Sequence, residues 1–330
     1  MVPPDGSGSP SSTTATAAGV TVHVPARRRA GSLRALRRSQ LAFLLWIFAP
    51  IIALFIIIRV IPIFVILLFS FTNYSITRPV WRWTGVANFE RLWGDANFLS
   101  ALWNSTEYVL VAVPAEVVLG LFFAVLLSRR VRFESFYETL YFLPYIIPMV
   151  PAAIIWKWIY APGSFGLANF YLEALGFGRV GWLTEPKIAL LAVIGMHVWK
   201  NLGFFVIVFL VGLKNIPADV KEAAAIDGAS EWQTIRRVEL PLLKPIILFG
   251  AVMATIWAWS AFTEVYIMTQ GTDVSTGTEI AVLVFRIYQE AFRFYNMGYA
   301  SAISFVLFVL SLLFVLFQFQ LFRGWKEEGA

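Results

Sequence analysis

The chain has 330 residues, of which 59% are hydrophobic, 16% aromatic and only 14% charged, with a formal net charge of +6. Soluble domains carry about 25% charged residues, so this chain has too few charges to cover a water-facing surface of its size. This composition excludes a largely disordered chain, a collagen, a coiled coil and a nucleic-acid-binding module. Cysteine is absent and only two histidines occur, which excludes disulfides and thiol catalysis and argues against a multi-histidine metal site.

The N-terminal segment differs in composition from the rest of the chain. Residues 1 to about 25 are rich in Ser, Thr, Gly, Pro and Ala, and arginines follow. Such a segment buries too little apolar surface to offset its ordering entropy. We therefore expect residues 1–39 to be a disordered basic tail, residues 40–325 to form the membrane domain, and residues 326–330 to be a short C-terminal tail.

Long apolar segments recur after the tail. Each is long enough to cross the roughly 30 Å hydrocarbon core as a helix, the only open structure that satisfies its backbone in lipid. Pro50 and Pro62 are expected to kink the first of them, or its outer end to project from the membrane. The sequence thus predicts an all-α integral membrane protein with six transmembrane helices, at 41–71, 105–128, 137–160, 188–213, 246–268 and 298–322.

The basic residues outside these segments are unevenly distributed. Sixteen Lys and Arg lie in the two tails, the loop after the second segment and the loop after the fourth, against seven in the other loops. Cytoplasmic loops carry the excess of positive charge, so both termini are expected in the cytoplasm of a multi-pass protein of the cell membrane. In an outer loop, residues 87–103 place apolar side chains at helical spacing, which predicts an amphipathic helix at the interface or, alternatively, a loop with aromatic anchors.

Five charged residues fall within the apolar segments. Each costs about 2.5–3.5 kcal/mol at the centre of a membrane helix unless it finds a partner or water. Lys157 lies near a segment end and can extend its amine to the interface. Arg59, Lys200 and Glu264 lie deeper and are expected to face the bundle interior or a wet cavity, where pairing between helices and ligand contact explain them equally well. The full set is Arg59, Glu116, Lys157, Lys200 and Glu264.

Two groups of polar and aromatic residues in the fourth and fifth segments are candidates for a substrate path. A sugar stacks its C–H faces on aromatic rings and pairs its hydroxyls with polar groups. Interhelical packing or an interhelical hydrogen bond is the alternative for both groups. At helical spacing, each set would share one face: Trp257, Ser260, Ala261 and Glu264 in the fifth segment, and His197, Asn201 and Phe204 in the fourth.

The loop at 214–245 carries the most specific pattern. Good helix formers after Glu222 predict a short helix that ends at a turn where Gly228 takes a positive φ or lies in close contact, and a second short helix leads to Leu240. Small side chains let a partner approach, and Glu222 offers a charge to a partner arginine. The pattern consists of Glu222, Ala223, Ala224, Asp227, Gly228, Leu240 and Pro241.

This pattern resembles the EAA signature of the permease subunits of binding-protein-dependent ABC importers: Glu-Ala-Ala, then Gly, then Leu-Pro at fixed spacing. Val238 stands where the signature has Ile. The resemblance covers roughly residues 40–325 and looks like the carbohydrate subgroup, of the maltose and glycerol-3-phosphate permease type. Gly271-Thr272-Asp273 departs from the Gly-Gly-Pro often found after the fifth span in this family.

The resemblance implies a fold and a set of partners. The fold is that of a type I ABC importer permease, and the loop at 214–245 is a coupling helix seated on an ATPase subunit. The partners are a second homologous permease subunit, two ATP-binding subunits, an extracytoplasmic solute-binding protein, a carbohydrate and the lipid bilayer. No phosphate-binding loop occurs in the sequence, so this chain should hold no cofactor, and ATP and Mg belong to the separate ATPase.

Two other function classes remain to be weighed. An integral-membrane enzyme acting on a lipid-linked sugar would need paired acids or a metal cluster at a membrane face, and the sequence shows neither. A stand-alone secondary transporter usually carries internal repeats, and none is detected. The sequence therefore favours the permease subunit of an ATP-driven sugar importer, with a di- or oligosaccharide, a monosaccharide and glycerol phosphate all open as substrate.

Overall fold

The computed structural model describes residues 43–44, 46–78, 81–129, 132–269 and 280–327. Helices make up the described secondary structure, with two isolated antiparallel bridges, Thr72 to Trp83 and Ser75 to Arg78, and no strand in those residues. Within these residues, five helices are long and apolar enough to cross a membrane, and a helix pair bent at a short break is a sixth candidate, either a broken span or a re-entrant loop. The predicted disordered tail at 1–39 and the Gly271-Thr272-Asp273 segment lie outside the described residues.

The chain divides into two units, one up to Ile61 and one from Pro62 onward. The first predicted span is the helix Trp46–Ser70, which contains a π-helical turn at Ile56–Val60 followed by α2, Ile61–Ser70. Pro62 has no N–H to donate, and a π turn absorbs such an interruption without ending the helix. The side chain of Arg59, in this turn, is exposed.

The outer segment predicted as one amphipathic helix at 87–103 is instead two helices. The first is α3, Ala87–Gly94, and the second is the start of α4, Ala96–Ser128. Asp95 separates them, because its carboxylate accepts the backbone N–H groups of Asn97 and Phe98 at 2.9 and 3.4 Å and so caps α4. The second span is consequently nine residues longer at its N-terminus than the predicted 105–128.

The third predicted span is broken. Its two halves, α5 (Glu134–Ile146) and α6 (Met149–Ile159), meet at 96°. Ile147 has an extended backbone, the conformation that a residue preceding a proline prefers, and Pro148 precedes the first turn of α6. Because of this bend, the C-terminal end of α5 and the N-terminal end of α6 lie next to each other.

The fourth span, α8 (Pro186–Lys214), is the most buried of the long helices. It packs along α4 and also contacts α5 and α11. Close approach to α5 depends on Gly203, because a Cβ there would lie 2.1 Å from the carbonyl oxygen of Tyr141. Before α8, the chain forms a 3₁₀ turn at Gly163–Phe165 and α7, Leu167–Ala174.

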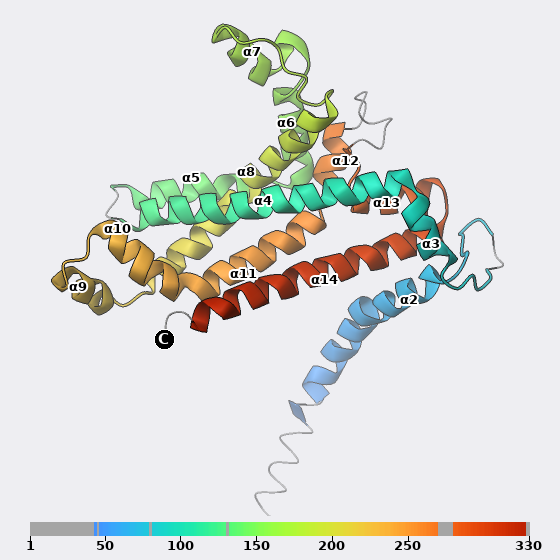
Figure 1. Ribbon diagram of the computed structural model, residues 1–330, viewed down its shortest axis with the longest axis horizontal. Coiled ribbons are helices and arrows are strands. Elements are labelled where there is room, and N and C mark those ends of the chain that lie inside the picture. Colours follow the sequence, from blue (N-terminus) through green and yellow to red (C-terminus); the bar gives the residue numbers. More distant parts are fainter. Residues whose placement is uncertain (1–42, 45, 79–80, 130–131, 270–279, 328–330) are drawn as a thin grey trace, which may run out of the picture. The chain divides into compact units, whose positions relative to one another are not determined.

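The fifth span is longer at its N-terminus and shorter at its C-terminus than predicted. It runs from Glu231 to Trp259. In Figure 1, α11 lies between α4 and α14, and it contacts both. The elements of this half of the chain are α9 (Ala218–Ile226), α10 (Glu231–Thr234), a π turn (Ile235–Glu239), α11 (Leu240–Trp259), α12 (Thr263–Thr269), α13 (Leu283–Tyr288), a second π turn (Gln289–Arg293) and α14 (Met297–Glu327).

Candidate functional site

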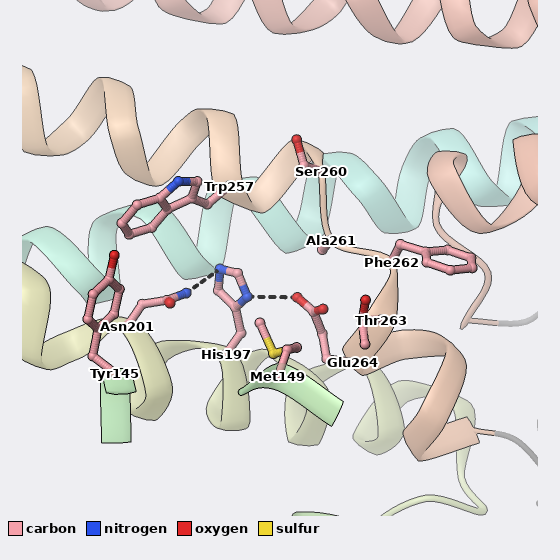
Figure 2. A pocket seen from close by; sticks show the side chains of 10 residues that line it. All are labelled: Tyr145, Met149, His197, Asn201, Trp257, Ser260, Ala261, Phe262, Thr263 and Glu264. Carbon is pink, nitrogen blue, oxygen red and sulfur yellow. Dashed lines mark hydrogen bonds and ion pairs between the residues drawn. The ribbon is translucent and has the colours of Figure 1, made fainter. Parts of the chain in front are cut away.

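A pocket of about 350 Å³ lies where the two helix breaks meet α8. Figure 2 shows Trp257 and Tyr145 together at one end and Phe262 and Thr263 at the other, with His197 between them. The lining comes from the α5–α6 break, α8, the end of α11 and the start of α12. The residues are Tyr145, Met149, His197, Asn201, Trp257, Ser260, Ala261, Phe262, Thr263 and Glu264.

His197 is the centre of a buried polar cluster beneath this pocket. Its Nδ1 lies 2.8 Å from Oε1 of Glu264, and its Nε2 lies 3.1 Å from Nδ2 of Asn201. The hydroxyl of Tyr108 donates to the same oxygen of Glu264 at 3.2 Å. A neutral imidazole with its proton on Nδ1 satisfies these contacts, because Nε2 then accepts from the Asn201 amide.

A second carboxylate approaches the ring from α4. Oε1 of Glu116 lies 3.4 Å from Nε2 of His197, and the residue is fully buried. Neither carboxylate oxygen of Glu116 has a hydrogen bond within the described part of the chain. The cluster therefore joins α4, α8 and α12 around one imidazole and leaves acceptors unsatisfied, an arrangement that costs free energy in a buried site.

Aromatic rings form one wall of the pocket. The Trp257 ring stacks on Tyr145 with 6.2 Å between centroids, and it packs against Phe204 at 4.9 Å and Phe205 at 5.7 Å. Phe204, which the sequence assigned to the substrate path, packs against Trp257 but is not among the residues that line the pocket. Stacked rings beside hydroxyl and amide groups are able to bind a polar ring such as a sugar.

The four residues predicted to share one face of a continuous fifth helix do line the pocket, but the helix is not continuous. It ends at Trp259, and the hydroxyl of Ser260 bonds back to the carbonyl of Ile256 at 2.7 Å. Such a side-chain bond competes with the next helical turn. Trp257 and Glu264 therefore line the same pocket from opposite sides of a helix break. The prediction that they share one face of an unbroken helix is wrong.

Two lysines within the spans donate hydrogen bonds to backbone carbonyls near these breaks. Nζ of Lys200 donates to the carbonyl of Tyr145 in the last turn of α5 at 3.2 Å and lies 5.3 Å from the Tyr145 ring centroid. Nζ of Lys157 donates to the carbonyl of Ile267 in α12 at 3.2 Å. A cation at a helix C-terminus satisfies carbonyls that have lost their helical partners. Lys157 thus bonds to the protein backbone, and its expected extension to the membrane interface stays a prediction.

The 214–245 loop forms the expected short helix, α9, with Glu222 exposed on it. Gly228 has φ +78°, which confirms the expected positive φ, and a Cβ added at this position would meet no described atom within 4 Å. The N–H groups of Gly228 and Ala229 bond to the carbonyls of Ala225 and Ala224, the Schellman pattern that ends a helix at glycine. The second short helix, α10, is not separate, because it continues through the π turn into α11 and Leu240.

Sequence reasoning missed several residues that build the site. Tyr145 and Met149 line the pocket because the third span bends, and Tyr108 bonds to Glu264 from α4. Pro148, inside the third predicted span, is the sequence feature from which a break could have been predicted, although it does not indicate the direction of the bend. Glu116 was visible as a charge within an apolar segment, yet nothing in the sequence pointed it toward His197.

A bundle of membrane-spanning helices with a polar, aromatic-walled pocket at its helix breaks is typical of a membrane transport protein. Residues 116–327 match the family described as binding-protein-dependent transport system inner membrane component, and the chain belongs to this family. It is a multi-pass permease subunit of an ABC transporter rather than an enzyme, and a binding protein is its partner.

Individual relatives agree with this assignment. The chain is 37% identical to a probable ABC transporter permease protein of Bacillus subtilis, covering 89% of this chain and 96% of the relative. It is 32% identical to the trehalose/maltose transport system permease protein of Thermococcus litoralis, covering 85% and 92%. A solved bacterial ABC transporter involved in the import of the acidic polysaccharide alginate matches with TM-score 0.73 and 26% identity, over 88% of this chain and 98% of that one.

Proposed function

We propose that this permease subunit moves a neutral sugar, a di- or oligosaccharide, from an extracytoplasmic binding protein into the cytoplasm by alternating access. The observation that carries the proposal is the pocket of about 350 Å³, in which the Trp257 ring lies beside His197 and Asn201. A sugar face stacks on the indole, and its hydroxyls pair with the amide of Asn201 and the carboxylate of Glu264 at the pocket wall. The trehalose/maltose permease among the relatives supports a sugar as the substrate.

The charge of the pocket favours a neutral substrate. No Arg or Lys is among the residues that line it, and Glu264 contributes a carboxylate with Glu116 behind it. A phosphate or an acidic sugar would be repelled by these acids and would lack the arginines that bind such groups. We therefore infer that the substrate class differs from the acidic polysaccharide named for the solved relative.

The family and the exposed helix α9 support a proposal for the remaining partners. We infer a heterodimer with a second homologous permease subunit, two ATP-binding subunits that hold ATP and Mg, and insertion in the cell membrane with both termini and the 214–245 loop in the cytoplasm. The exposed Glu222, on a helix of small residues, supports docking of α9 on the ATPase.

The test is uptake by proteoliposomes that contain this chain, its second permease subunit and the ATPase, with the binding protein outside and ATP inside. ATP-dependent accumulation of a radiolabelled neutral oligosaccharide is expected, and a phosphorylated or acidic sugar should not be taken up. Uptake without ATP would contradict the importer assignment, and uptake only of anionic substrates would overturn the substrate class.

A further inference from the structure

We propose that Glu239 is a positioning residue that transmits movement of the coupling helix α9 to three membrane helices: α4 and α8, which carry part of the polar cluster around His197, and α11, which carries Trp257. The proposal rests on the function proposed above, because it assumes that an ATPase subunit moves α9. Glu239 lies in the π turn between α10 and α11, and its side chain is only 1% exposed. A carboxylate buried to this degree is costly unless it is paired, so its partners matter.

Two cations approach Glu239 from different elements. Nζ of Lys221, on α9, lies 3.3 Å from its Oε1. Nη2 of Arg129, the residue that caps the C-terminus of α4, lies 3.6 Å from its Oε2. The same Lys221 amine donates to the carbonyl of Leu213, in the last turn of α8, at 3.3 Å. One buried carboxylate and its partner lysine thus join α9 to α4, α8 and the start of the α11 segment.

Two of these helices, α4 and α8, carry part of the polar cluster, and the third, α11, carries the Trp257 wall of the pocket. Glu116 lies on α4, His197 on α8 and Trp257 on α11. A shift of α9 therefore acts, through Lys221 and Glu239, on one end of α8 and α11, which line the pocket, and of α4, whose Glu116 lies against His197. The elements are rigid helices, so displacement at one end is carried to the pocket.

Two adjacent residues of α9 make its two different contacts, one with the ATPase subunit and one with Glu239. Glu222 is exposed and available to a partner, whereas the Lys221 side chain is directed to the buried Glu239. The two ion pairs are long, and neither carboxylate oxygen of Glu239 has a hydrogen bond within the described residues. A buried pair that is only partly satisfied is able to rearrange when the partner moves α9, which suits a contact that must differ between transport states.

The experiment uses the full complex in proteoliposomes and compares Glu239→Gln with Glu138→Gln. Glu138 is a matched control, because its carboxylate also pairs with a lysine, Lys214 at 2.9 Å, but the pair is solvent-exposed. The two measurements are basal ATPase activity and the stimulation of ATPase activity by sugar-loaded binding protein. Hydrogen exchange of the α9 amides in the same complexes reports whether α9 is held less firmly.

We expect Glu239→Gln to retain basal ATPase activity but to lose stimulation by about fivefold or more, the lower end of typical coupling between sites. Exchange in α9 should rise, and Glu138→Gln should behave as wild type. If Glu239→Gln does not assemble, Lys221→Met replaces it, because Lys221 is partly exposed and its loss removes the same link. Full stimulation in the assembled variant overturns the proposal. Absence of stimulation in the wild-type complex instead refutes the proposed function.

Discussion

Nδ1 of His197 and Oε1 of Glu264 lie 2.8 Å apart and join α8 to α12 across the break that ends α11. Both residues are buried, so the pair and the Tyr108 hydroxyl bond fix α12 at the position where the fifth span is no longer helical. Glu264 is thus held in position by protein groups at the wall of the pocket.

Replacing Glu264 by Ala should destabilise the protein, because His197 and Tyr108 lose their common acceptor inside the bundle. Breaking one partner of a buried pair costs about 3–5 kcal/mol. The measurement is the thermal unfolding midpoint of the detergent-solubilised complex. Glu138→Ala, at an exposed pair, is the control and should change the midpoint little. An unchanged midpoint for Glu264→Ala would show that the pair does not hold α12.

Replacing Trp257 by Ala should weaken sugar transport while assembly and basal ATPase activity persist. The indole is the ring that stacks on Tyr145 at the pocket wall. Loss of such a stacking surface is expected to raise the sugar concentration for half-maximal transport by about tenfold, which corresponds to about 1.4 kcal/mol. Trp103→Ala removes an exposed indole on α4 and should have no such effect. Equal transport by both variants would refute the stacking role.

The Trp257 face also shows how far sequence reasoning reaches. The combination of aromatic and polar residues in the fifth segment predicted a shared site, and these residues do line one pocket. The prediction assumed a continuous helix, which the structure does not have. The break at Ser260 contains no proline or glycine, so the sequence has no helix-breaking residue from which it could be predicted. The turn at Gly228, by contrast, was predictable, because a positive φ after a helix is a local property of the backbone. Contacts such as Glu116 with His197 join residues far apart in the chain and depend on helix packing.

Replacing Lys200 by Met should destabilise the bend between α5 and α6. The amine satisfies the Tyr145 carbonyl, and leaving a buried carbonyl unpaired costs about 1–3 kcal/mol. The expected result is a lower unfolding midpoint together with weaker sugar transport, since Tyr145 forms the pocket wall. Lys187→Met, at an exposed position near the start of α8, is the control. A Lys200→Met complex with unchanged stability would indicate that water replaces the amine at this carbonyl.

Gly203 and Gly195 on α8 allow a matched comparison of helix packing. A Cβ at position 203 would lie 2.1 Å from the Tyr141 carbonyl oxygen, whereas a Cβ at position 195 would lie 3.7 Å from the nearest side-chain atom. Gly203→Ala must therefore displace α5, and overpacking of this kind costs about 1–3 kcal/mol. Yield and unfolding midpoint of the assembled complex should fall for Gly203→Ala and not for Gly195→Ala. Equal behaviour would mean that α5 is free to move away from α8.

Substitutions at Gly228 should reduce transport in an order set by backbone conformation. The residue has φ +78° and open space around it, so the penalty arises from the left-handed backbone and not from a clash within this chain. Asn tolerates this region better than Ala, and β-branched Val tolerates it least. Coupled transport should therefore decrease from Gly228→Asn through Gly228→Ala to Gly228→Val. Gly178→Val, at a glycine with equally open surroundings and no positive φ, is the control. Equal loss for Asn and Val would instead indicate that the ATPase subunit contacts position 228 directly and admits no side chain there.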